Sequence, residues 1–176
     1  DDPTDTINQV YYQNTTSTTM ETVTKYAHTP NVTDAGVAST TYANNLNTTD
    51  TVTIDGATSM NVTIYYDAES TSWDWVSVYQ SPFTISDSND ATISTTTGNL
   101  SGKLSGRNNG RTANYSTWYS KTYTITGDTV KFHFKSDSSQ AYYGYYAIVT
   151  ADVEVETEVF EPISGTYATP SSSQTH

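Results

Sequence analysis

Short stretches in which apolar and polar side chains alternate recur along this chain, and they constrain its fold more than any other feature. In the run MNVTIYY, Met60, Val62, Ile64 and Tyr66 share one face of an extended strand. Similar runs are separated by turns rich in Gly, Asp and Pro, and no stretch of ten or more residues shows helical periodicity with capping residues. Eight or more short strands of this kind predict an all-β fold, an antiparallel β-sandwich.

Two of these strands allow their inner faces to be predicted. In WDWVSVY, the alternating pair Val76 and Val78 indicates the face that points into the sandwich. In KFHFK, Phe132 and Phe134 are expected to point inward, and His133 is therefore expected to point outward with the neighbouring lysines. On this interpretation His133 is a surface histidine on a strand rather than a catalytic group.

The chain has 176 residues, a length that fits one domain with terminal arms. Residues 1–24 are mostly polar, apart from the run VYY at 10–12, and are expected to form an N-terminal arm or linker that contributes one short strand at most. The alternating segments place the β-sandwich in residues 25–160. Residues 161–176 are rich in Ser, Thr and Pro, which is typical of a linker.

The material for a core comes from aromatic rings rather than from leucine. Only 34% of the residues are hydrophobic, but the chain contains 15 tyrosines, three tryptophans and four phenylalanines. Each ring can bury a large apolar area. Thr, Tyr and Val also favour pleated, half-buried surfaces, so the composition supports β structure.

The chain is strongly acidic, with a formal net charge of −12. Such a surface repels nucleic-acid phosphates and anionic lipids, and no apolar run is long enough to insert into a membrane. The few basic residues include Arg107 and Arg111, with Lys103 nearby, in a Gly- and Asn-rich loop, where they are expected either to be solvated or to meet an acidic partner. Acidity is compatible with cation binding, and carboxylate clusters are where Ca²⁺ would be sought.

The chain contains no cysteine, which excludes disulfides and thiolate metal sites. Animal secreted domains of this size often rely on disulfides. Their absence, together with a composition rich in Thr, Ser, Asn and Tyr, indicates an extracellular, cell-surface protein of the Gram-positive type. No signal-peptide pattern opens the sequence, so we expect a mature or excised segment of a larger protein.

Several spaced elements resemble the CUB family of extracellular β-sandwiches of the jelly-roll type. The family pattern combines an aromatic residue before a Glu, an aromatic-Asp-aromatic strand, a Ser-Asp-x-Ser-like turn and a late Gly-aromatic-x-Ala strand. Its counterparts here are Tyr66 to Glu69, Trp73-Asp74-Trp75, Ser136-Asp137-Ser138 and Gly144 to Ala147. The stretch from YAHTPNV to NTTDTVTI also looks like the lead-in of Cys-free, CUB-like modules in large surface proteins of gut Firmicutes. The resemblance covers roughly residues 25–150, without the disulfides of animal members.

The resemblance implies a calcium site formed by Glu69, Asp74 and Asp137, with Asp67 and Ser138 as supporting ligands. Ca²⁺ prefers six to eight hard oxygen ligands, and three carboxylates without a cation would repel one another. Family members often use this edge to bind a partner protein by offering carboxylates to a lysine. Three separate, solvated acids are the alternative. Glu69 and Asp74 are closer in sequence than the usual pair of the family.

Exposed aromatic rings suggest a second kind of site, because flat rings stack on sugar faces. Trp118, Tyr119, Tyr142 and Tyr143 are the candidates for such ligand binding, with Trp118 and Tyr119 lying next to the Gly- and Asn-rich loop. The alternative is that these rings fill the core or cover strands. Within YYGYY, the family pattern assigns Tyr145 to the core face.

The sequence predicts a non-catalytic module, because no nucleophile elbow, zinc-protease motif or phosphate-binding glycine loop is present. The leading hypothesis is adhesion to a host or neighbouring-cell protein, for which mucosal glycoproteins and immunoglobulins are both candidates. The first alternative is a carbohydrate-binding module that recognises a glycan through exposed aromatics. The second is a structural spacer or fibre subunit whose arms pair between chains.

Overall fold

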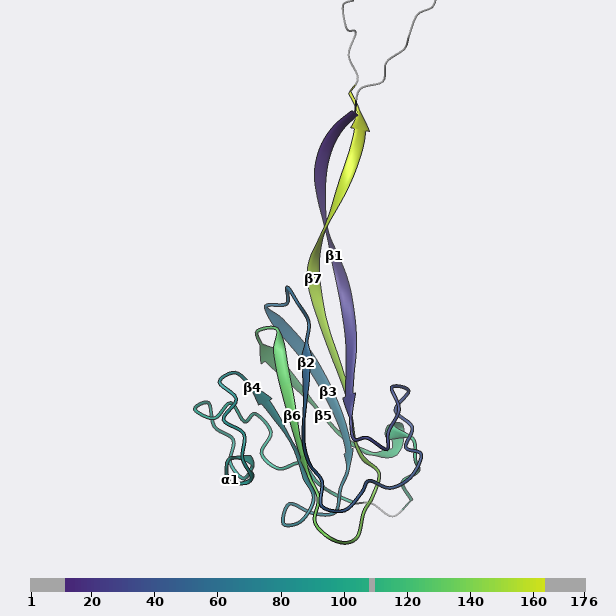
Figure 1. Ribbon diagram of the computed structural model, residues 1–176, viewed down its shortest axis with the longest axis vertical. Helices are drawn as coiled ribbons and strands as arrows, with labels where there is room; N and C mark the ends of the chain where they lie inside the picture. The colour runs from purple at the N-terminus through teal and green to yellow at the C-terminus, as the bar shows by residue number, and fades with distance from the viewer. Residues whose placement is uncertain (1–11, 108–109, 164–176) are drawn as a thin grey trace, which may run out of the picture. The chain divides into compact units, whose positions relative to one another are not determined.

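The computed structural model describes residues 12–107 and 110–163 and shows two antiparallel β-sheets with very little helix (Figure 1). The predicted all-β sandwich is therefore confirmed. A four-stranded sheet has the order β1-β7-β3-β5 and a three-stranded sheet the order β2-β6-β4. The elements are β1 (Tyr12–His28), β2 (Asn47–Thr53), β3 (Ser59–Asp67), β4 (Trp75–Gln80), the short helix α1 (Asp87–Asp90), the 3₁₀ helix η1 (Tyr115–Thr117), β5 (Tyr119–Thr126), β6 (Thr129–Lys135) and β7 (Gly144–Pro162).

The chain divides into two compact units. The larger unit, Glu21–Val153, contains the sandwich, whereas residues 154–160, predicted to belong to it, group with the N-terminal segment in the smaller unit. The described part of the smaller unit pairs residues 12–20 of β1 with residues 154–162 of β7 as a two-stranded ribbon, in which the Thr15 hydroxyl donates to the carbonyl of Val159. Most of the predicted C-terminal linker and the first eleven residues lie outside the described residues.

The core lies between the two sheets and follows the predicted alternation. On β3, Met60, Val62 and Ile64 are buried, and each faces the second sheet because side chains alternate along the strand. The Tyr145 ring on β7 reaches across to the other sheet, with ring centroids 5.7 Å from Phe132 and 6.0 Å from Phe134. The predicted inward faces of β6 and β7 are therefore confirmed.

The prediction that His133 points into solvent is wrong. His133 is only 3% exposed, and all five residues from Trp75 to Tyr79 are buried. The segment that follows β4 folds back over the outer face of the three-stranded sheet and brings the carboxylate of Asp90 against it. Asp90 accepts hydrogen bonds from Trp75 Nε1 (2.8 Å), the Tyr79 hydroxyl (2.6 Å) and His133 Nδ1 (2.6 Å).

The outer face of the four-stranded sheet is also covered over part of its area. Val32, Ala38 and Trp118 form a second buried cluster with Tyr146, the β7 residue that alternation places opposite to Tyr145. Tyr115 of η1 packs on Tyr146 with ring centroids 4.8 Å apart. Covering segments on both sheets explain how a leucine-poor chain buries so many aromatic rings.

One glycine is required where β7 begins. Gly144 has φ of +100°, and a β-carbon built on it would lie 2.1 Å from Thr29 Oγ1. Thr29 is itself fully buried, so it cannot move away into solvent. The glycine in YYGYY therefore allows β7 to pass close to the loop after β1, which orients Tyr143 and Tyr145.

None of the helices among residues 12–107 and 110–163 is long and apolar enough to span a membrane.

We predict that Asp90→Asn lowers the free energy of unfolding by about 3 kcal/mol, because an amide cannot accept hydrogen bonds from all three buried donors. Urea unfolding at pH 7 measures the change.

The pKa of Asp90 is lowered, against the effect of burial, by hydrogen bonds from His133, Tyr79 and Trp75. Its stabilisation is therefore present at pH 7 and is lost as pH falls through that lowered pKa. The exposed Asp55→Asn is the control, and an equal effect of both substitutions would contradict the prediction.

Candidate metal centre

Three carboxylates from separate segments converge at one end of the sandwich. Glu69 lies two residues after β3, Asp74 directly precedes β4, and Asp137 lies two residues after β6. One carboxylate oxygen from each residue can be chosen so that all three lie within 4.8 Å of one another. The structure thus brings together the three residues that the sequence predicts as calcium ligands.

The short loop between Glu69 and Asp74 is a tight turn. The backbone N–H groups of Trp73 and Asp74 both donate to the carbonyl of Ser70, at 3.0 and 2.9 Å. This turn reverses the chain within four residues. It therefore allows two carboxylates that are close in sequence to face the same point without a longer, disulfide-closed loop.

Asp74 is the fixed member of the cluster. It is buried, and its Oδ2 accepts a hydrogen bond from the Tyr42 hydroxyl at 2.6 Å, while its Oδ1 accepts one from the backbone N–H of Asp137 at 2.7 Å. The carbonyl of Asp137 accepts from the N–H of Asn45 at 2.6 Å. Asp74 therefore ties the ends of β4 and β6 together and sets the position of Asp137.

Glu69 is the member that lacks a partner. Its Oε2 is buried and has no hydrogen-bond donor within the part of the chain that the structure describes. Desolvation raises the pKa of Glu69, the negative charges of Asp74 and Asp137 raise it further, and only Arg107 opposes them. Burial likewise raises the pKa of Asp74, although hydrogen bonds from Tyr42 and Asp137 oppose the effect. The cluster therefore holds more negative charge than the nearby arginine and hydrogen-bond donors compensate.

A calcium ion fits this arrangement chemically. Oxygens on opposite sides of a Ca²⁺ ion lie about 4.6–5.2 Å apart, because each is about 2.3–2.6 Å from the metal, and the spacing of the three carboxylates suits that shell. All of the ligands are hard oxygens, with no histidine or thiolate among them, which favours Ca²⁺ over zinc. Glu69, Asp74 and Asp137 would hold the ion, and backbone carbonyls and water would complete its coordination.

The two residues expected to support the metal have other contacts. Asp67 is buried in an ion pair with Arg111, whose Nη1 donates to its Oδ1 at 2.8 Å, while its Oδ2 accepts from the N–H of Tyr143 at 3.2 Å. The carbonyl of Ser138 accepts from Asn44 Nδ2. Burial raises the pKa of Asp67, and Tyr143 and Arg111 oppose the rise. Asp67 therefore anchors the loop that carries Arg111, and Arg111 is paired within the chain rather than solvated or available to an acidic partner, the two outcomes expected for it.

The four aromatic residues predicted to bind a ligand lie in three different environments. Trp118 is only 6% exposed and stacks on Tyr143 with parallel rings 6.1 Å apart, so it cannot offer its face to a sugar. Tyr119 is 43% exposed, but the Arg111 guanidinium lies 3.7 Å from its ring centroid. The Tyr142 hydroxyl accepts from Arg107. A ligand role for the exposed members stays a prediction.

Sequence reasoning missed Tyr42 at this end of the molecule, and it named Arg107 only as part of a basic loop. Tyr42 lies in the lead-in stretch and is buried, and its only signal in the sequence is an aromatic residue within a polar run. Arg107 is exposed, and its interaction with Tyr142 depends on a fold that no local pattern reveals.

A second group of metal-ligating side chains, Asp87, Asp90 and His133, also converges. Here every acid has a partner, because Asp90 accepts from three donors and Asp87 pairs with Lys135. His133 Nε2 lies 2.8 Å from Asn47 Oδ1. The second group is therefore a satisfied structural network, in contrast to the cluster around Glu69.

We predict that Glu69→Gln has opposite effects on stability with and without calcium. In EDTA at pH 7 the variant should melt at a higher temperature than the wild type, because an ionised Glu69 with a raised pKa costs folding free energy. In calcium the order should reverse, because a ligand is lost. The difference in EDTA should shrink as pH falls through the raised pKa of Glu69, because a protonated Glu69 no longer carries the uncompensated charge. Melting temperatures by circular dichroism test this against Glu21→Gln, an exposed control, and an unchanged order in the two buffers would contradict it.

The comparisons with known proteins do not place the chain in a family. No protein-family model matches it, and no curated protein matches it significantly. The assignment of the metal centre therefore depends on the geometry and electrostatics of this chain's own residues.

Proposed function

We propose that this chain is a CUB-like, calcium-binding module of a bacterial cell-surface protein that adheres, without catalysis, to a host or neighbouring-cell protein. One observation carries the proposal: three carboxylates from separate loops converge, and one buried oxygen of Glu69 has no donor among the described residues. Leaving such a group uncompensated costs folding free energy, which a protein accepts where a ligand supplies the missing charge.

The solvent exposure of the three metal-ligating carboxylates indicates how this end of the sandwich would hold a partner protein. Asp74 is buried, whereas Glu69 and Asp137 are half-buried and have surface that a partner can approach. A bound calcium ion supplies two positive charges and orders the carboxylates. Carboxylate oxygens that face solvent can then accept hydrogen bonds from a lysine ammonium of the partner, a charge-assisted contact that is stronger than a neutral one.

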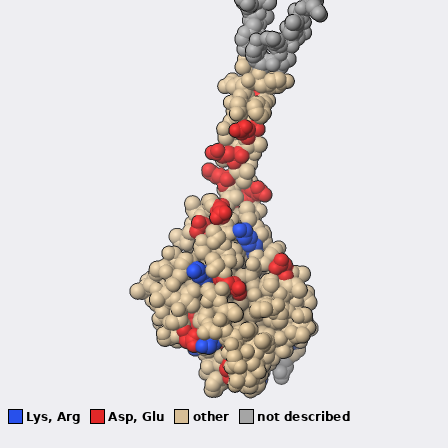
Figure 2. All heavy atoms as spheres, viewed as in Figure 1, with Lys and Arg blue, Asp and Glu red and all other residues tan. Residues whose placement is uncertain are grey.

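The alternatives have less support. A fibre formed by pairing of ribbons is opposed by Glu154, Glu156 and Glu158, which alternate along one side of β7, while residues 12–20 and 154–163 contain no lysine or arginine. Like charges on an edge discourage strand pairing between copies, and Figure 2 shows acidic side chains in red along the ribbon. Sugar stacking is opposed by the burial of Trp118.

The proposal predicts binding that needs both calcium and partner lysines. Mucin and immunoglobulin, each immobilised in native and lysine-acetylated form, would be probed with the full chain in calcium and in EDTA. We expect binding to at least one native protein in calcium, with at least tenfold loss on chelation, on acetylation and in Asp137→Ala. The same assay with Asp55→Asn should match the wild type. Failure to bind either protein, or binding that is insensitive to EDTA and acetylation, would overturn the proposal.

A further inference from the structure

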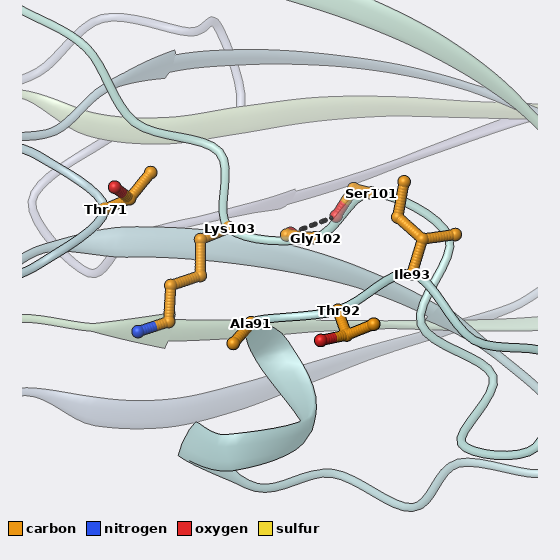
Figure 3. A pocket seen from close by; sticks show the side chains of 7 residues that line it. All are labelled: Thr71, Ala91, Thr92, Ile93, Ser101, Gly102 and Lys103. Atoms are coloured by element: carbon orange, nitrogen blue, oxygen red, sulfur yellow. Dashed lines mark hydrogen bonds between the residues drawn. The ribbon is translucent and has the colours of Figure 1, made fainter.

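A hollow of about 700 Å³ opens on the surface beside the segment that covers the three-stranded sheet. Its walls are Thr71, Ala91, Thr92, Ile93, Ser101, Gly102 and Lys103. Figure 3 shows Lys103 extending between Thr71 and Ala91, with Ile93 and Ser101 at the other side of the view. The hollow is formed by Thr71 and by two short stretches of the covering segment, residues 91–93 and 101–103.

Lys103 gives this hollow a positive charge that the protein does not neutralise. Its Nζ lies 3.4 Å from the centroid of the Trp75 ring, a cation–π contact that fixes the ammonium group without consuming its hydrogen-bond capacity. Within residues 12–107 and 110–163, no carboxylate pairs with it, whereas Lys135 pairs with Asp87 and Arg111 pairs with Asp67. The ammonium remains free to donate to an anionic ligand at short range, against the long-range repulsion of anions by a chain with a net charge of −12.

The other walls indicate what kind of anion would fit. The hydroxyls of Thr71 and Thr92 make no hydrogen bond within the described part of the chain and so are free to bind a ligand. Ser101 is different, because its hydroxyl accepts from the N–H of Val78 and donates to the carbonyl of Gly102, which makes that wall rigid. Ile93 is 66% exposed and offers an apolar surface beside these polar groups.

This combination matches a sugar ring that carries a carboxylate. The ammonium of Lys103 suits the carboxylate, the free hydroxyls of Thr71 and Thr92 suit sugar hydroxyls, and the side chain of Ile93 suits the C–H face of a pyranose ring. We propose that the hollow lined by Thr71, Thr92, Ile93 and Lys103 binds an acidic sugar residue, a uronic or sialic acid. The site contains none of the carboxylates of the metal centre, and the aromatic ring beneath Lys103 holds the ammonium rather than stacking on the sugar.

The test is a titration of the ¹⁵N-labelled full chain followed by NMR, in EDTA so that no calcium can bridge a carboxylate to the acidic cluster. Sodium glucuronate and N-acetylneuraminic acid are the probes, methyl glucoside is the neutral sugar, and N-acetylaspartate is an acid without a sugar ring. We expect shifts at residues 91–93 and 101–103 with at least one acidic sugar at millimolar concentration. Methyl glucoside and N-acetylaspartate should bind at least tenfold more weakly.

Lys103→Gln should weaken binding of the acidic sugar by about tenfold, because a charge-assisted contact becomes a neutral one. Lys121→Gln, an exposed lysine on β5, is the matched control and should bind as the wild type does. Thermal melting of both variants checks their folding, and Ile93→Asn provides a second variant that keeps the charge but should also weaken binding. Equal affinity of Lys103→Gln and wild type, equal binding of the neutral sugar or of N-acetylaspartate, or no binding up to 50 mM would each overturn the proposal.

Discussion

The buried carboxylate of Asp90 is the contact on which the three-stranded half of the sandwich depends. A sheet of three strands with one face on the core would leave Trp75, Tyr79 and His133 in water, yet all three are buried and donate to this one side chain. The hydrogen bonds hold the segment after β4 against the sheet. The same segment continues along the edge of β4, where the N–H of Val76 donates to Leu104. One charged group thus organises both a buried face and a protected edge.

Hydrogen bonds from aromatic side chains to buried or half-buried acids recur in the described part of this protein, which contains no cysteine. The hydroxyl of Tyr145 donates to Asp50, that of Tyr42 to Asp74 and that of Tyr79 to Asp90. These pairs satisfy the polar end of a ring whose apolar body fills the core, which is how tyrosine can serve in place of leucine. Against this background, the uncompensated Glu69 is an exception. That contrast is the physical reason for proposing that Glu69 binds an ion rather than serving a structural role.

The alternating pattern of the sequence was enough to predict the strands, whereas the inward face of Tyr145 and the convergence of Glu69, Asp74 and Asp137 were expected only from the resemblance to CUB domains. The sequence pattern was misleading for His133, because alternation distinguishes the two faces of a strand but does not show that the outer face is exposed to solvent. The covering segment that buries His133 has no regular periodicity, so its position depends on long-range contacts such as the one from Asp90. The hollow around Lys103 was equally hidden, since the basic residues of one loop separate in space. Arg111 is buried with Asp67, whereas Lys103 lies over Trp75.

The turn from Ser70 to Trp73 has a further consequence, because it borders both of the proposed sites. Glu69 and Asp74 lie directly on either side of it, and Thr71 within it lines the hollow. Any molecule that restrains this turn changes the conformational freedom that remains for the next one. If a ligand at one proposed site restrains this turn and changes the affinity of the other site, linkage requires the second ligand to change the affinity of the first by the same factor.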